Sequence, residues 1–255
     1  MTIRIVCISD THEQHHKVNV PYGDVLIHAG DFCLFDGTRR QVKNFASWFA
    51  SQPHLHKVVI SGNHDAAFQT MPDRAREWLK VKSRDSGAQV GCHYLENETV
   101  DLDIDGRGLK IHGAPQHPGD YGMAFTTEDE EDRKAKWALF PMNSEIIVVH
   151  GPPYGILDET KWDEVARNPF DGAETRIEHS VRDGCRALRR KLEAMSDLKL
   201  VVCGHIHSGF GTSRLDSGAL VVNAALCGAH HLLDLKRRPI VVDLSPQGTA
   251  TLVEY

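Results

Sequence analysis

Residues 57–65 read Lys-Val-Val-Ile-Ser-Gly-Asn-His-Asp, an apolar run that stops at a glycine and leads directly into polar side chains. The apolar part does not alternate with polar residues, which is typical of a strand buried on both faces. The same pattern recurs at residues 3–8, 25–29, 146–149 and 200–203, each followed within two residues by Gly, Asp or His. Buried strands that end in this way predict an α/β fold with polar side chains gathered at one sheet edge.

Helical patterns separate several of these runs. Residues 39–51 and 182–195 carry apolar side chains at helical spacing, and residues 71–81 and 128–139 are further helix candidates. The first third of the chain therefore reads as strand, helix, strand.

Two antiparallel hairpins are expected later in the chain. Residues 99–104 and 109–113 flank one Gly-containing turn, and residues 240–244 and 249–253 flank another. Residues 161–181 are polar with turn signals and predict a long surface loop. Because no linker or repeat interrupts the pattern, we expect a single domain that covers residues 1–255.

Composition narrows the class of protein. The chain has 255 residues, 41% hydrophobic content and a formal charge of -6, which is ordinary for a soluble globular protein and disfavours binding to a nucleic-acid polymer. No signal peptide or transmembrane segment is recognised, and the six scattered cysteines suit a reducing compartment, so we expect a cytoplasmic protein without membrane partners. Sixteen histidines, several at strand ends, are the unusual feature.

Five strand-end motifs carry the chemistry. In chain order they are Asp10-Thr11-His12, Gly30-Asp31, Gly62-Asn63-His64-Asp65, His150-Gly151 and Gly204-His205-Ile206-His207. Asp, Asn and His together suit divalent ions such as Mn, Fe or Zn. Any one of these histidines alone would more often be structural, but the ordered set predicts a metal centre.

This ordered set resembles the calcineurin-like metallophosphoesterase superfamily. Longer blocks at residues 23–31, 57–65, 150–158 and 204–211 are similar to its MPPED-like branch, which is related to the class III cyclic-nucleotide phosphodiesterases. The resemblance covers nearly the full length. It implies a sandwich of two mixed β-sheets flanked by helices, with metals at the strand ends.

The resemblance also implies a ligand set for two divalent metal ions, most readily Mn, with Fe or Zn as alternatives. Asp10, His12 and His207 would hold one ion. Asn63, His150 and His205 would hold the other, and Asp31 would bridge both. A hydroxide shared by two such ions is a strong nucleophile at neutral pH.

Two further residues receive roles from the same resemblance. His64 would protonate the leaving oxygen or, together with Asn63, bind the phosphoryl group. Asp65 would orient His64 by accepting its other ring proton.

The resemblance therefore implies a metallophosphoesterase, and we expect a phosphodiesterase acting on small substrates such as cyclic nucleotides. A phosphomonoesterase or protein phosphatase is the alternative among enzymes, and a non-catalytic scaffold on the same fold is the alternative outside them. No motif position is missing, which disfavours the scaffold. The physiological substrate, the metal and the oligomeric state stay open, and the insertion at residues 161–181 could rim the site and alter its specificity.

Other polar residues receive simpler interpretations. His28 is expected to be a hydrogen-bonded core histidine, and His230 and His231 to be surface residues. For His117 an edge-of-site role stays open. Asn223 is a candidate for supporting the metal ligands from behind.

Overall fold

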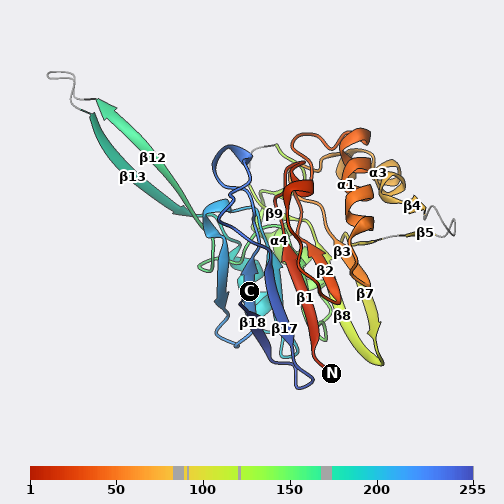
Figure 1. The fold of residues 1–255 in the computed structure, drawn as a ribbon. Coiled ribbons are helices and arrows are strands. Elements are labelled where there is room, and N and C mark those ends of the chain that lie inside the picture. Colours follow the sequence, from red (N-terminus) through yellow and green to blue (C-terminus); the bar gives the residue numbers. More distant parts are fainter. Residues whose placement is uncertain (83–88, 91, 120–121, 168–173, 255) are drawn as a thin grey trace.

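The computed structural model describes residues 1–82, 89–90, 92–119, 122–167 and 174–254. Two six-stranded mixed sheets pack face to face in these residues, and helices cover their outer faces (Figure 1). This is the layered α/β sandwich that the sequence resemblance implies.

The first sheet is built around the N-terminal strands. Its order is β18-β17-β1-β2-β3-β6, with β1, β2, β3 and β6 parallel and the C-terminal hairpin β17–β18 added antiparallel to β1. The bounds are β1 Ile3–Ile8, β2 Val25–His28, β3 His56–Val59, β6 His93–Tyr94, β17 Ile240–Leu244 and β18 Ala250–Val253.

The second sheet has the order β15-β16-β14-β11-β8-β7. Its central strands β8, β11, β14 and β16 are parallel, and antiparallel strands close both edges. The bounds are β7 Glu98–Ile104, β8 Arg107–Ala114, β11 Ile146–Val149, β14 Leu200–Cys203, β15 Gly211–Arg214 and β16 Leu220–Asn223.

A continuous apolar layer joins the two sheets. It includes Ile5 and Ile27 from the first sheet and Ile111, Val148 and Val202 from the second, all completely buried. The strands are apolar on their other faces too, because helices pack there. This double burial explains why their sequences read as continuous rather than alternating runs.

Helices complete both outer layers. Helices α1 (Arg39–Ser51) and α3 (Pro72–Leu79) contribute to the apolar cluster outside the first sheet, and α4 (Glu130–Ala138) and α5 (Arg186–Glu193) to the one outside the second. Helix α1 has the predicted bounds and begins with a capping box, in which Thr38 and Gln41 satisfy each other's backbone N–H groups.

The remaining elements are short. They are η1 (His15–Lys17), α2 (Ala67–Thr70), β4 (Val81–Lys82), β5 (Gln89–Val90), β9 (His117–Pro118), β10 (Thr126–Thr127), η2 (His207–Gly209) and η3 (Ala229–His231).

The surface-loop prediction for residues 161–181 is wrong for 161–167 and 174–181, which form strands, and its middle part, 168–173, lies outside the described residues. Strands β12 (Glu159–Arg167) and β13 (Glu174–Arg182) pair as an antiparallel ribbon that projects from the body of the molecule (Figure 1). The apolar side chains described along it, Trp162, Val165, Ile177 and Val181, are all exposed, so the sequence lacks the apolar periodicity that marks a half-buried strand. The predicted helix at residues 182–195 is shorter in the structure. Because residue 182 still belongs to β13, α5 begins only at Arg186.

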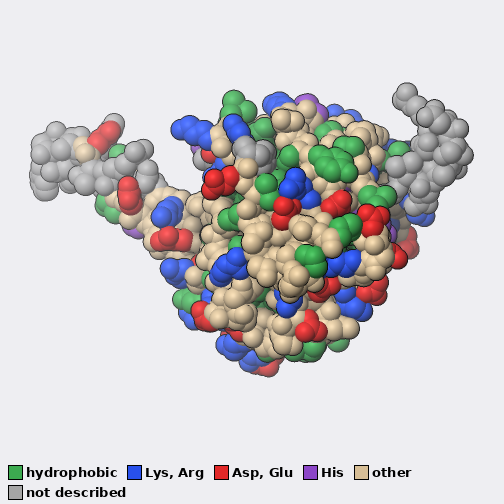
Figure 2. All heavy atoms as spheres, turned by 60° about the horizontal axis from the view of Figure 1, so that its bottom comes forward, with side chains coloured by type: hydrophobic (Ala, Val, Ile, Leu, Met, Phe, Trp, Pro, Cys, Tyr) green, Lys and Arg blue, Asp and Glu red, His purple; other side chains and the backbone are tan. Residues whose placement is uncertain are grey.

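The surface carries both signs of charge. On the face drawn in Figure 2, the described Lys and Arg side chains are interspersed with Asp and Glu, and neither sign covers a continuous area. None of the helices in the described residues has the length and apolar character needed to cross a bilayer. All six cysteines are free thiols.

Candidate metal centre

The predicted ligands meet where the parallel strands of both sheets end. Asp10, Asp31 and Asn63 follow β1, β2 and β3 of the first sheet. His150 and His205 follow β11 and β14 of the second. Both sheets therefore contribute side chains to one site, as expected for the carboxyl edge of parallel strands.

The backbone at these strand ends is unusual. Asp10, His12, Asp31 and His205 all have left-handed conformations, with φ angles of 51°, 39°, 57° and 67°. Such a conformation costs a non-glycine residue roughly 1–3 kcal/mol and tends to occur at functional sites. The strain turns each side chain out of its strand direction and into the site.

Two glycines make room for this convergence. A Cβ at Gly62 would collide with the Asp31 carboxylate and the His150 ring, and one at Gly204 would collide with the Asp10 carboxylate. Glycine is thus the residue that lets the backbone approach these carboxylates so closely.

One group of donor atoms comes from Asp10, His12 and His207, which offer ligand atoms within 4.8 Å of one another. His207 Nε2 lies 3.2 Å from Asp10 Oδ1 and 3.4 Å from His12 Nε2. Two imidazole nitrogens that face each other at this distance are typical of a site that accepts a cation between them.

A second group surrounds Asn63. Its side-chain oxygen lies 2.9 Å from His150 Nε2 and 2.9 Å from His205 Nδ1. An amide oxygen and two imidazole nitrogens form a donor set that a divalent ion accepts.

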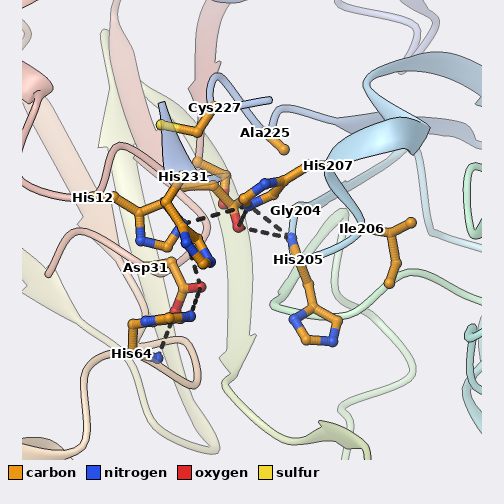
Figure 3. A network of polar contacts seen from close by, with 12 residues as sticks. His12, Asp31, His64, Gly204, His205, Ile206, His207, Ala225, Cys227 and His231 are labelled. Atoms are coloured by element: carbon orange, nitrogen blue, oxygen red, sulfur yellow. Dashed lines mark hydrogen bonds and ion pairs between the residues drawn. The ribbon is translucent and has the colours of Figure 1, made fainter. Parts of the chain in front are cut away.

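Asp31 stands between the two groups. Its Oδ1 lies 3.5 Å from His150 Nε2. Its Oδ2 lies 3.8 Å from Nε2 of His12, whose ring stands beside Asp31 in Figure 3. The two carboxylate oxygens therefore face different donor groups.

Backbone carbonyls orient three of the histidines. The Nδ1 atoms of His12, His150 and His207 bond to the carbonyl oxygens of Cys33, Ala29 and Gly228 at 3.1, 2.9 and 2.9 Å. A carbonyl only accepts, so each Nδ1 carries a proton and each Nε2 faces the site, where it can bind a metal ion once it is unprotonated. Anchors of this kind orient imidazole ligands in metal sites.

Electrostatics favour bound cations here. Burial opposes ionisation of Asp10 and Asp31, but His207 and His150 respectively outweigh it and hold both carboxyl pKa values below their usual range. Burial likewise opposes the proton on His150, yet the charge of Asp31 raises its pKa to about 9. A cation that binds at His150 would take the place of that proton.

His64 enters the same site from the loop after β3. Its backbone N–H donates to Asp31 Oδ1 at 2.9 Å, and its ring Nε2 lies 4.0 Å from Asp31 Oδ2 (Figure 3). Its Nδ1 donates to the carbonyl oxygen of Leu34.

The predicted pairing of His64 with Asp65 is therefore wrong. The Asp65 carboxylate accepts the backbone N–H groups of Asp31, Gly62 and Cys33 at 2.8, 2.9 and 2.9 Å. Asp65 is completely buried and holds two ligand-bearing loops together, while Leu34 takes the place expected for it beside His64.

The structure places two other histidines against the site. The ring of His231, expected at the surface, lies 4.5 Å from that of His12 and 4.8 Å from that of His64. The ring of His117 lies 4.4 Å from that of His205. The sequence offered one indication that His231 could reach the site: it lies eight residues after Asn223, which ends strand β16.

The structure agrees with the interpretation of Asn223 as a support for the ligand loop and of His28 as a hydrogen-bonded core histidine. Asn223 Nδ2 donates to the carbonyl oxygen of Ile206 at 2.9 Å and so steadies the loop that carries His205 and His207. His28 is completely buried and bonds to Thr11 Oγ1 at 3.0 Å.

A cavity of about 720 Å³ opens over the site. Its wall combines donor residues with apolar ones and with the base of the β12–β13 ribbon. It is lined by Asp31, Phe35, Asn63, His64, Met123, Thr160, Lys161, His205, Ile206, His207, Ser208, Gly228, His230, His231 and Arg237.

The chain is similar to known proteins over most of its length. A family model described as calcineurin-like phosphoesterase matches residues 3–209. The human metallophosphoesterase domain-containing protein 1 is 34% identical over 254 residues, covering 94% of this chain and 71% of that protein. A UPF0046 protein of Caenorhabditis elegans is 33% identical over 249 residues, covering 95% of this chain and 81% of that protein.

Proposed function

The chain belongs to the calcineurin-like phosphoesterase family of metal-dependent phosphoester hydrolases, and we propose that it is a dinuclear phosphodiesterase that cleaves small phosphodiesters such as cyclic nucleotides. The observation that carries this proposal is the position of Asp31 between two groups of donor atoms, one around Asp10 and one around Asn63.

The residues present fit two divalent ions. In this proposal Asp10, His12 and His207 would hold one ion, and Asn63, His150 and His205 would hold the other. Asp31, which lies between the two groups, would bind both. The ligand set is oxygen and imidazole, which suits Mn and also accepts Fe or Zn. Bound ions of this kind supply Lewis acidity toward the phosphoryl group and a water of lowered pKa.

The remaining chemistry falls to His64. Its Nε2 is directed at the space beside Asp31, while Nδ1 is engaged by Leu34. In the protonated ring, Nε2–H would donate to the leaving oxygen. Asn63 would contribute to substrate binding through its side-chain amide.

The apolar side chains that line the cavity support a small substrate with an apolar part. Phe35 is 58% exposed, although it lines the cavity and its ring lies only 5.9 Å from that of His64. Met123 also lines the cavity and is partly exposed. Apolar side chains held in contact with water at a site are suited to the flat face of a nucleobase.

The test is a substrate panel with the metal-loaded protein. Protein stripped with a chelator and reloaded with Mn²⁺, Fe²⁺ or Zn²⁺ would be assayed on bis-p-nitrophenyl phosphate, p-nitrophenyl phosphate, and 2′,3′- and 3′,5′-cyclic nucleotides. We expect no hydrolysis without metal and a higher kcat/KM for the diesters. Preference for the monoester would replace the proposal with a phosphomonoesterase, and full activity without metal would overturn the metal centre.

A further inference from the structure

His231 lies over the centre without any role in the ligand set. Its ring, together with those of His12 and His64, forms a triangle whose centroids are 4.5, 4.8 and 4.8 Å apart. The ring of His207 is 5.5 Å away. In Figure 3 the His231 side chain projects into the space around Asp31, toward the same point as His12 and His64.

The backbone is strained to hold this position. His230 and His231 are consecutive residues with left-handed backbone, both at φ 57°. Two such residues in a row are costly unless the surroundings hold them. Gln14, from the loop after β1, does so, since its Nε2 donates to the carbonyl oxygen of His231 at 2.8 Å.

The loop that leads to His231 is fastened as well. Arg237 donates to the carbonyl oxygens of Ala225 and Cys227 at 2.9 and 2.6 Å, and the Gly228 N–H donates to that of Leu232 at 2.8 Å. His231 is thus on a rigid turn, although it belongs to neither sheet.

Its ring nitrogens differ from those of its neighbours. His12, His64 and His207 each use Nδ1 to bond a backbone carbonyl. Neither ring nitrogen of His231 has a hydrogen-bond partner among the described residues, and the residue is part of the cavity wall. An imidazole that is rigidly placed, partly open to the cavity and unbonded is available to a ligand.

We infer that His231 is a substrate-binding residue that donates a hydrogen bond to a phosphoryl oxygen, on the side of the centre formed by Asp10, His12 and His207. The inference rests on the proposed function, since it takes a phosphoryl group as the ligand. His64 and His231 would then contact the phosphoryl group from two directions, and neither would hold a metal. In this arrangement His231 contacts a phosphoryl oxygen, and His64 is free to protonate the leaving oxygen.

The experiment compares three substitutions in the full-length, Mn²⁺-loaded protein. His231→Ala removes both nitrogens. His231→Asn places an amide nitrogen near the position of Nδ1 and tolerates left-handed backbone, whereas His231→Gln reaches the position of Nε2. His16→Ala is the control, because His16 is exposed and does not line the cavity.

We expect His231→Ala to lower kcat/KM about 10- to 100-fold, the usual effect of losing a hydrogen bond to a charged group. Inorganic phosphate, measured by calorimetry, should bind correspondingly less tightly. Metal content by elemental analysis should stay at the wild-type value. Either the Asn or the Gln variant should restore part of both losses and so identify the donating nitrogen.

Other outcomes would overturn the inference. Unchanged kcat/KM and phosphate affinity in His231→Ala would leave the ring as cavity wall only, and loss of metal would make it a ligand. If the wild-type protein hydrolysed no substrate in the panel, the proposed function would fail. The phosphate titration of wild type and His231→Ala would still test whether His231 contacts a phosphoryl group.

Discussion

Two hydrogen bonds hold His64 in place. Its backbone N–H donates to Asp31 Oδ1, and its ring Nδ1 donates to the carbonyl oxygen of Leu34. Because neither contact uses Nε2, that nitrogen can serve the substrate. His64→Ala should therefore keep its metals and lose about 10²–10⁴-fold in rate with an alkoxide leaving group. The loss should be smaller with p-nitrophenolate, which needs little protonation.

The check is elemental analysis together with rates on both kinds of diester. Equal slowing of both leaving groups would point to phosphoryl binding rather than proton donation. Loss of metal would show that His64 supports the ligand set.

Asp65 acts on the backbone rather than on His64. Its Oδ2 accepts two N–H groups and its Oδ1 a third, so Asp65→Asn would turn an amide NH₂ toward at least one donor. An unsatisfied buried donor costs about 1–3 kcal/mol. We expect a lower melting temperature and weaker metal retention, measured by calorimetry and elemental analysis.

Asp197→Asn is a suitable control for Asp65→Asn, because Asp197 is exposed. If Asp65→Asn kept its stability and metals but lost activity as His64→Ala does, the orienting role first expected for Asp65 would return.

His15 gives the folded state a pH dependence. It is completely buried against Phe45 and Trp48, and both ring nitrogens lack partners within the described residues. Burial, with a smaller effect of His16, lowers its pKa to about 4. The unfolded chain, with a histidine pKa near 6.5, takes up a proton that the folded chain refuses, so stability falls as pH drops from about 6.5 to about 4.

His15→Phe keeps an aromatic ring and removes this effect. Between pH 8 and pH 5 its free energy of unfolding should improve relative to wild type by about 1–2 kcal/mol. Urea unfolding at both pH values measures the difference. A difference that does not change with pH would mean that His15 takes up its proton at the same pH in the folded and the unfolded chain.

At the scale of elements, the β12–β13 ribbon has two parts with different contacts. We call residues 159–161 the base of the ribbon, and the part that begins at the Trp162–His179 pair the arm. At the base, Thr160 and Lys161 line the cavity, and Ser208 donates to the carbonyl oxygen of Glu159 at 2.6 Å. Farther out, Trp162 stacks on His179 and is 48% exposed. The base can therefore influence substrates, whereas the arm projects from the body of the molecule (Figure 1).

Shortening the arm tests this division. Trp162 pairs with His179, so an Asn-Gly turn in place of residues 163–178 would close the ribbon at that pair. Metal content and kcat/KM for a small diester should stay at wild-type values. Lys161→Ala, at the base, should raise KM instead. A large loss of activity in the shortened protein would show that the arm contributes to the site.

At the scale of the whole molecule, the centre joins the two sheets. Asp10, Asp31 and Asn63 come from the first sheet and His150 and His205 from the second, so bound ions would tie the layers together. A ligand at a thousand times its Kd adds about 4 kcal/mol to the folded state. Removing metal should thus lower the melting temperature by about ten degrees.

Calorimetry before and after chelation, and after Mn²⁺ is restored, measures this shift. Asp31→Ala provides the control, because a protein without the bridging carboxylate should respond much less to chelator. An equal response in both proteins would place the stabilising metal elsewhere.

The sequence by itself determined which segments form the central strands, where α1 begins and ends, and where the two antiparallel hairpins lie. It also determined which residues follow the strand ends at the centre. These features are local: a continuous apolar run, a capping box or a turn with glycine is specified by neighbouring residues. The strand ends bring their side chains to one edge because parallel strands share a direction. That rule predicted that Asp10, Asp31 and Asn63 meet, and likewise His150 and His205, while the family resemblance implied that the two sets share one centre.

Only the tertiary structure decided the partners of Asp65, the position of His231 and the form of residues 159–182. Asp65 lies beside His64 in the chain, yet two of the three N–H groups it satisfies belong to Asp31 and Cys33, more than thirty residues earlier. His231 reaches the centre because Gln14, more than two hundred residues earlier, holds its carbonyl oxygen. Strands β12 and β13 pair with each other from Glu159 to Arg167 and from Glu174 to Arg182, and such backbone pairing leaves little trace in the side-chain pattern where the side chains are exposed.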